Sequence, residues 1–526
     1  MSRWSGPSGR AAEGWTLERL TPPSRLYGAN GIAAGPDGRL YVAQVPGSQI
    51  SALDIDSGVI ETISPMGGAI VAPDDLAFDD AGNVYATEIT ENRVCRRRPN
   101  GQVEVIRGDI PVANPITWHA GRLIAGECRI GARIMELPLD GGEPRVICAD
   151  VPMANAFAVG PDGRLYFPVM GANQIWRVSL DGGEPEVVAG DLGVPDSVKF
   201  DSQGRIVTTQ FASGQVLRID PASGAREVLA QLETGLDNCA FVGERLFVSN
   251  IAGSVTEVLA EGGTRSVVGH GLQWPLGLAA GPDGVFVADG GFNYLLGSDG
   301  DLRPVANLFT PGGPGYVRGV CMGGAEGDWL LTTGLGGVAR WRVGAEAEWL
   351  GQGFDRLMGV AALGGTAVVA EYGAGRVLAL AGGGVEVLAD GLDRPMGVAA
   401  ADDGTVYISE AGRGRILALG GGRAETVAEG LGRPEGLAVA GGSLYAVDSA
   451  AKTVVRIVSA GHQECIASDL PVGVPAGVTP KPLGPIGDMA GPMINFAGIA
   501  AGRDGALRVA GDGEGSVLAL RPMEAR

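Results

Sequence analysis

The sequence predicts an all-β fold of two tandem six-bladed β-propellers, with four antiparallel strands in each blade. Three observations support this prediction. A unit of about 40 residues recurs along the chain, which is the period of a propeller blade. Each copy contains four short apolar segments separated by turn residues. The composition combines 89 Gly and 32 Pro with a hydrophobic fraction of 45%, so turns are frequent and a core can still form.

The repeat is clearest in its first copy, residues 31–64. The segments "GIAAGPDG", "RLYVAQ", "QISALDID" and "VIETIS" follow one another there, and Pro36-Asp37-Gly38 marks the first turn. Because a single ring of twelve blades would leave a very wide axis, the copies are divided into two rings of six. An apolar residue of the first strand anchors each copy: Ile32, Leu76, Ile116, Phe157, Val198, Cys239, Leu278, Val320, Val360, Val398, Leu437 and Ile499.

The chain ends decide how the two rings close. The last copy ends after its third strand, "SVLALRP", while the N-terminal segment "WTLERLT" belongs to no copy. If residues 15–21 complete the sixth blade, residues 264–269 can complete the twelfth, and the domains are 1–262 and 263–526. We predict this arrangement. In the alternative, the N-terminal strand crosses to the second ring, and the boundary moves to about residue 272.

One position in every blade distinguishes the two rings. The first strand of a blade lines the central channel, so the residue two places before each anchor lies at the channel mouth. In the first ring this column is Asn30, Asp74, Asn114, Asn155, Asp196 and Asp237. In the second ring it is Leu276, Arg318, Met358, Met396, Glu435 and Ala497. Asn and Asp also favour strand starts for local structural reasons, but that explanation would apply equally to the second ring.

The first-ring column is predicted to bind a metal ion. Carboxylates that point at one axis repel each other, and a divalent cation among them removes the conflict. Mixed carboxylate and amide oxygens suit a hard ion, so Ca²⁺ is expected first, Mg²⁺ second, and Zn²⁺ less readily. The three His and six Cys are too scattered for a zinc cluster, and the thiols are expected to be buried and free.

A second column lies at the ends of the second strands, on the same face of the ring. It consists of Gln44, Glu88, Glu127, Val169, Gln210 and Asn250. Glu88 and Glu127 are candidate acid–base groups or additional metal ligands. The second ring has acids at the same positions, Asp289, Glu371, Glu410 and Asp448, so a structural role is the alternative.

The segment "ANGIAAGPDGRLYVAQ", residues 29–44, resembles the blades of the SMP-30/gluconolactonase/LRE-like superfamily of six-bladed propellers. The resemblance implies a catalytic calcium held by Glu in blade one, Asn in blades three and four, and Asp in blade five. Asn114, Asn155 and Asp196 match the last three in order. Asn30 departs from the pattern because it replaces the expected Glu, and Asp74 or Asp237 would have to supply the missing charge.

The resemblance also implies a function. The first ring would be a metal-dependent hydrolase that opens a lactone or related ester, with Asp196 as the general base. Residues at this face that would give the pocket an apolar wall, and so favour a hydrophobic substrate, are Tyr27, Met66, Met153, Met170 and Phe211. A metal-dependent lyase or isomerase, and a non-catalytic binding scaffold, are the alternatives.

The net charge of −20 excludes nucleic acid and an anionic membrane as expected partners. The sequence has no transmembrane span, and the N-terminal residues lack the apolar region of a signal peptide, so a cytoplasmic protein is expected. The second ring has no ligand set and is expected to be a scaffold or a homodimer surface. Its insertion, residues 472–498, should lie on the channel-mouth face as a lid or a contact.

Overall fold

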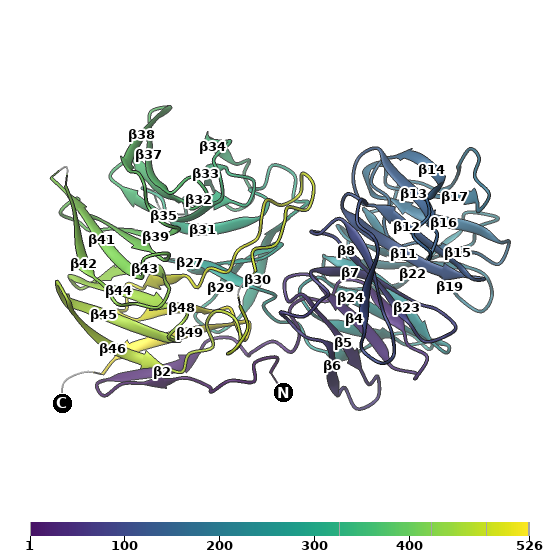
Figure 1. Ribbon diagram of the computed structural model, residues 1–526, viewed down its shortest axis with the longest axis horizontal. Coiled ribbons are helices and arrows are strands. Elements are labelled where there is room, and N and C mark those ends of the chain that lie inside the picture. The colour runs from purple at the N-terminus through teal and green to yellow at the C-terminus, as the bar shows by residue number, and fades with distance from the viewer. Residues whose placement is uncertain (1, 326, 422, 480, 524–526) are drawn as a thin grey trace. The chain divides into compact units, whose positions relative to one another are not determined.

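The computed structural model describes residues 2–325, 327–421, 423–479 and 481–523. The chain forms two compact units, Leu26–His270 and the combination of Met1–Arg25 with Gly271–Arg526. We call them the first and the second propeller. Within the described residues each unit contains six sheets arranged as blades, which confirms the predicted fold (Figure 1). No helix in this part of the chain is long and apolar enough to cross a membrane.

The first propeller contains six four-stranded antiparallel sheets, each with its strands in chain order. Its first three blades are β3 (Ile32–Ala34), β4 (Leu40–Gln44), β5 (Gln49–Leu53) and β6 (Ile60–Ser64); β7 (Pro73–Phe78), β8 (Val84–Glu88), β9 (Arg93–Arg97) and β10 (Val103–Arg107); and β11 (Ala113–His119), β12 (Arg122–Glu127), β13 (Ala132–Leu137) and β14 (Arg145–Val151). The other three are β15 (Ala158–Val159), β16 (Arg164–Val169), β17 (Gln174–Ser179) and β18 (Glu186–Ala189); β19 (Pro195–Phe200), β20 (Ile206–Gln210), β21 (Gln215–Ile219) and β22 (Arg226–Gln231); and β23 (Leu236–Val242), β24 (Arg245–Asn250), β25 (Val255–Val258) and β26 (Thr264–Val268). A 3₁₀ turn, η1 (Met170–Ala172), follows β16.

The second propeller follows the same plan but uses two N-terminal strands, β1 (Arg10–Ala11) and β2 (Trp15–Arg19). Its first three blades are β27 (Pro275–Gly281), β28 (Gly284–Asp289), β29 (Phe292–Leu296) and β30 (Leu302–Asn307); β31 (Val317–Met322), β32 (Trp329–Thr333), β33 (Val338–Trp341) and β34 (Glu348–Gly351); and β35 (Leu357–Leu363), β36 (Thr366–Glu371), β37 (Arg376–Ala381) and β38 (Gly384–Ala389). The fourth and fifth are β39 (Pro395–Ala400), β40 (Val406–Glu410), β41 (Arg415–Gly420) and β42 (Arg423–Ala428), and β43 (Pro434–Ala440), β44 (Ser443–Asp448), β45 (Thr453–Ser459) and β46 (His462–Ser468), extended by β1. The sixth is β47 (Ile499–Ala501), β48 (Leu507–Gly511), β49 (Ser516–Pro522) and β2.

The rings close in the opposite way to our prediction. β26 pairs with β25 and completes the first propeller, while β2 pairs with β49 and completes the second. The domain boundaries 1–262 and 263–526 are therefore wrong, and the alternative with a boundary near residue 272 is correct. The physical reason is the short hairpin before β26, where Gly262 and Gly263 both have positive φ and allow a tight turn. A neighbouring strand reaches the edge of β25 at much lower loop-closure cost than a distant one.

The apolar core lies between neighbouring blades rather than at the axis. One cluster joins Phe157 and Phe167 of the fourth blade to Ile124 and Ile134 of the third, all fully buried. Strand side chains alternate between the two faces of a blade, and each face packs on the next blade. Every blade is therefore fixed by its two neighbours, which fixes the position of the inner strands around the channel.

Most inner strands contain a β-bulge at the channel mouth. In β7 the register shifts between Pro73 and Leu76, so that Asp74 and Asp75 together lie opposite the single residue Thr87. Equivalent shifts occur in β11, β19 and β23 of the first propeller. A bulge changes the direction of the local side chains and bends the strand. Two successive side chains of one strand can therefore lie at the channel.

A candidate metal and active site in the first propeller

The six predicted ligands all lie at the start of the inner strands. Five of them are buried and Asp237 is partly exposed. Hydroxyl groups of the preceding blade contact the main chain of three of them, Asn30, Asn114 and Asp237. Thr87 Oγ1 donates to the carbonyl oxygen of Asn114 at 2.7 Å, and Ser249 Oγ donates to that of Asn30 at 2.7 Å. The column is thus positioned by contacts between blades.

The three acids of the column influence one another strongly. Burial and the charge of Asp75 raise the pKa of Asp74 to about 8. Burial, with the charges of Asp74 and Asp75, raises the pKa of Asp196 well above its usual value. Burial, with the charges of Asp196 and Asp74, does the same for Asp237. These carboxylates cannot all be ionised at neutral pH unless a positive charge joins them, which is the chemistry expected of a cation site.

The amides of the column are partly engaged by the protein. Asn30 donates through Nδ2 to Asp237 Oδ2 at 3.3 Å and accepts at Oδ1 from the amide of Val45 at 3.2 Å. Asn155 Nδ2 contacts Met170 Sδ at 3.2 Å, and its Oδ1 accepts from the amide of Ala156 at 2.9 Å. An amide oxygen has two lone pairs, so each Oδ1 keeps one for a ligand.

Asp196 has a distinct position among the acids. Within the described residues, its buried Oδ1 has no hydrogen-bond partner. Its side chain is 3% exposed, so bulk water does not solvate that oxygen freely. A buried carboxylate oxygen without a donor is costly unless a cation or a substrate proton approaches it. This is the strongest single indication that the column binds something.

The sequence analysis did not select Asp75 and Asn238, each of which directly follows an Asp of the column. Asp75 Oδ1 accepts from Asn238 Nδ2 at 3.1 Å, a bond that joins the second and sixth blades. Asp75 Oδ2 also accepts from the amide of Ile116 at 3.2 Å. Burial raises the pKa of Asp75 to about 6, although the Lys199 ammonium opposes this. The signal was present in the sequence, since both residues directly follow an Asp of the column.

Cys128 is the other neighbour that sequence reasoning did not select. The thiol is buried and hydrogen-bonded to the side chain of Asn114. Burial, followed by the charges of Asp74, Asp196 and Asp237, raises its pKa well above the usual value. The thiol is therefore protonated at neutral pH and lies within electrostatic reach of all three acids. It contributes bulk, and not a thiolate, to the site.

Glu88 and Glu127 occupy ion pairs at the ends of the second strands. Arg93 contacts Glu88 at 2.6 Å, and Arg129 contacts Glu127 at 2.8 Å with Arg133 on its other oxygen. The second propeller repeats the arrangement, with Arg376 on Glu371 at 2.7 Å. These Glu–Arg ion pairs also occur in the second propeller, which has no acidic column. Their recurrence favours a structural role for this position.

The acids alone do not form a metal cluster. Within the residues that the structure describes, no three His, Cys, Asp or Glu side chains are grouped so that they could hold an ion. The predicted ligand set does not rely on such a group, because half of it is amide oxygen. Its donor chemistry fits a hard cation, and the unpartnered Asp196 Oδ1 fits one as well.

The two propellers also differ at the residue that directly follows each column position. All six blades have Gly there, and these glycines line a cavity of only about 30 Å³: Gly277, Gly319, Gly359, Gly397, Gly436 and Gly498. A Cβ at Gly277 would clash with the carbonyl oxygen of Arg318. In the first propeller the corresponding residues are Gly31, Asp75, Pro115, Ala156, Ser197 and Asn238. Backbone therefore closes the second axis, whereas side chains, several of them polar, line the first.

No protein-family model matches the sequence, and no curated protein matches it. Solved structures with a similar fold include a streptogramin B lyase, 18% identical, which covers 52% of this chain and 95% of its own with a TM-score of 0.39. A gluconolactonase from Xanthomonas campestris is 17% identical and covers 47% and 93%, with a TM-score of 0.38. Regucalcin from Agrobacterium tumefaciens str. C58, described as a calcium-binding protein, is 21% identical and covers 44% and 85%, with a TM-score of 0.35. At these values the likeness concerns the fold alone.

Proposed function

We propose that the first propeller binds a divalent cation, with Ca²⁺ preferred, and catalyses the hydrolytic opening of a lactone or related ester. The observation that carries this proposal is the set of three acids at one channel mouth, two buried and one partly exposed, each with a raised pKa. Three amides, those of Asn30, Asn114 and Asn155, belong to the same column. The second propeller, with the same fold, has no such set at the equivalent positions.

The residues divide into ligands and a base. Asn114 and Asn155 would bind the ion without adding charge, while Asp74 and Asp237 would balance its charge. The bound cation would supply a Lewis acid that polarises the carbonyl oxygen of the substrate. Asp196 would take a proton from the attacking water, since its Oδ1 has no donor among the described residues. Burial of the site excludes bulk water and strengthens these interactions.

The substrate is proposed to be apolar, apart from its ester group. Three side chains expected to line the pocket, those of Tyr27, Met170 and Phe211, are buried. The turn η1 places Met170 Sδ against the amide of Asn155. The thioether therefore lies directly beside a proposed ligand, where it would contact the body of a substrate. A hydrophobic lactone suits such a wall better than a sugar lactone.

A lyase or isomerase on the same residues is the second candidate. Burial and the charges of Asp74 and Asp75 raise the pKa of Asp196, so this carboxyl can also donate a proton. A group of this kind can exchange protons with carbon or with a leaving group as well as with water. The two candidates differ in the fate of the substrate, because only hydrolysis incorporates oxygen from water.

Metal content and one pair of variants test the proposal. Elemental analysis should find about one Ca²⁺ or Mg²⁺ per chain, and a lactone panel should show turnover that a chelator abolishes. Asn155→Met copies the residue that the second propeller uses and should remove metal and activity while the protein stays folded. Met396→Asn is the reciprocal change in the second propeller and should leave both unchanged. Activity that survives in Asn155→Met would disprove the site.

Turnover in ¹⁸O-labelled water separates the two candidate reactions. A hydrolase incorporates the label into the carboxylate product, whereas a lyase or isomerase yields an unlabelled product. A protein with no metal and no turnover on any lactone would support the scaffold alternative.

A further inference from the structure

The channel mouth of the second propeller contains two buried charges of opposite sign. Arg318 comes from the second blade and Glu435 from the fifth, so they face each other across a six-bladed ring. Both side chains are fully buried. The rest of the column is apolar, and it is also fully buried: Leu276, Met358, Met396 and Ala497.

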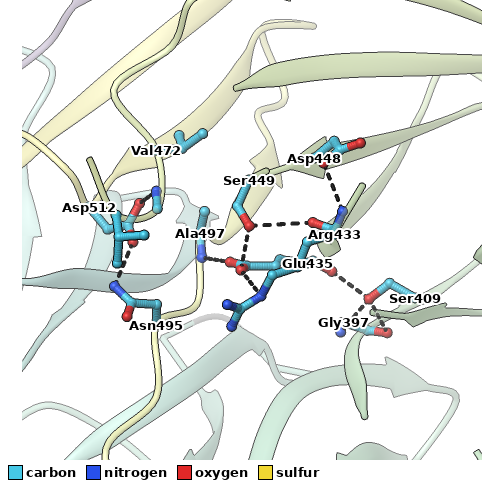
Figure 2. A network of polar contacts seen from close by, with 12 residues as sticks. Gly397, Ser409, Arg433, Glu435, Asp448, Ser449, Val472, Asn495, Ala497 and Asp512 are labelled. Carbon is cyan, nitrogen blue, oxygen red and sulfur yellow. Dashed lines mark hydrogen bonds and ion pairs between the residues drawn. The ribbon is translucent and has the colours of Figure 1, made fainter. Parts of the chain in front are cut away.

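The acidic side of this mouth is satisfied by the protein. Glu435 Oε1 accepts from Ser449 Oγ at 2.6 Å and pairs with Arg433 at 2.9 Å, while Oε2 accepts from the amide of Ala497 at 2.6 Å (Figure 2). The nearby Asp512 is satisfied in the same way, by the amide of Gly473 at 2.6 Å and by Asn495 at 3.3 Å. Each carboxylate oxygen of Glu435 and Asp512 therefore accepts a hydrogen bond from a described residue.

The basic side is not satisfied. Arg318 Nη1 contacts the sulfur of Met358 at 3.7 Å. Among the residues that the structure describes, its buried Nε and Nη2 have no hydrogen-bond partner. The hydroxyl of the buried Tyr316 likewise has none in this part of the chain. Burial lowers the pKa of Arg318; Tyr316 opposes this and Arg356 adds to it, and the resulting pKa is about 10.

The insertion, of which the structure describes residues 472–479 and 481–498, covers this region. Its two ends are anchored near Glu435 and Asp512, where Gly473, Asn495 and Ala497 make the contacts described above. Its middle is a short hairpin in which Leu483 bridges Met493. A Cβ on Gly334 would lie 3.3 Å from the amide nitrogen of Gly491 and 3.5 Å from Arg318 Nη2. The insertion therefore spans the mouth from the fifth blade to the second and encloses Arg318.

We propose that the second propeller binds a small organic monocarboxylate beneath residues 472–498. Its carboxylate is held by the Arg318 guanidinium and the Tyr316 hydroxyl, and its apolar body contacts Met358 and Met396. A planar guanidinium with two unused N–H groups on one edge matches the two oxygens of a carboxylate. The fully buried Met358 and Met396 favour an organic monocarboxylate over an inorganic dianion such as phosphate, which has no apolar part for them to contact.

Calorimetric titration of the full-length chain with acetate, hexanoate and benzoate tests this site. The wild-type protein should bind an apolar carboxylate saturably at one site per chain, and more tightly than acetate. Met358→Glu introduces an internal carboxylate beside Arg318 at similar side-chain length, and it should weaken binding by about 10- to 100-fold. Met358→Leu keeps the apolar wall without the charge, so its loss of affinity should be much smaller than that of Met358→Glu.

Stability measurements show whether the variants fold and give a second readout. In anion-poor buffer Met358→Glu should unfold at a higher temperature than the wild type, because its new ion pair neutralises Arg318. If that variant does not fold, Tyr316→Phe serves instead and should lose about tenfold in affinity. Absence of carboxylate binding to the wild type, equal binding to Met358→Glu, or tighter binding of phosphate or sulfate would each overturn the proposal.

Discussion

Replacing Asp74 with Asn should stabilise the metal-free protein at mildly alkaline pH and weaken its binding of Ca²⁺. Burial and the charge of Asp75 raise the pKa of Asp74 from 3.8 to about 8. Between these two values the folded protein holds a proton that the unfolded chain has released. The free energy of unfolding therefore falls as the pH rises through this window, and it changes no further above it.

The size of the effect follows from the same two values. One proton gives a slope of about 1.4 kcal/mol per pH unit. From about pH 4 to pH 8 the loss for a single carboxyl sums to about 5 kcal/mol, which is a ceiling because the neighbouring acids share the cost. Asn has a similar shape and cannot ionise, so Asp74→Asn should retain much of this free energy at pH 8.

Urea unfolding in the presence of a chelator, between about pH 5 and pH 8, measures this difference. The comparison between wild type and variant is the informative quantity, because burial also raises the pKa of Asp289, Glu435 and Asp512 in the second propeller. The stability difference should grow with pH in favour of Asp74→Asn. Calorimetric titration with Ca²⁺ should show weaker binding to the variant. Parallel pH curves for the two proteins, or equal Ca²⁺ affinity, would refute the reasoning.

Three further predictions follow from other parts of the structure. Glu88→Gln should lower stability by about 1–3 kcal/mol through loss of the Arg93 pair, yet leave the metal content unchanged; a loss of metal would reassign this residue to the site. Deleting residues 1–25 should destabilise the second propeller alone, visible as selective proteolysis after residue 271, and equal digestion of both units would contradict the pairing of β2. Gly397→Ala should destabilise the second propeller by about 1–3 kcal/mol in thermal unfolding, because the new Cβ clashes with the carbonyl oxygen of Glu435. Ala156→Gly makes the reverse change in the first propeller and should create no such clash there.

The sequence contained enough information to predict the architecture. Turn triplets such as Pro161-Asp162-Gly163 recur at the blade period, and the structure places a turn there with Gly163 at positive φ. Ring closure was harder to predict because two strands could fill either gap. The deciding feature, a tight turn at Gly262 and Gly263, is a local preference that a repeat alignment does not weigh.

The candidate site was predicted only at the level of one column. Simple strand alternation sends Asp75 away from the channel, but the bulge in β7 brings it into the same polar network as Asn238. Bulges depend on main-chain register, which single residues do not reveal. For Glu88 a usable signal did exist. Glu88 and Arg93 are partners across a hairpin, and the same spacing recurs in Glu371 and Arg376.

The pairing of β2 with β49 has a consequence for biosynthesis. Residues 26–270 contain every strand of the first propeller, so that ring can form before the rest of the chain is made. Trp15–Arg19 must instead wait for Ser516–Pro522, its partner at the far end of the chain. Until then it is an unpaired strand with its backbone donors and acceptors available to other molecules. The second ring is therefore completed late, and it is the more vulnerable of the two. Its rate of assembly should depend on how far the N-terminal segment of the nascent chain is protected from contact with other molecules.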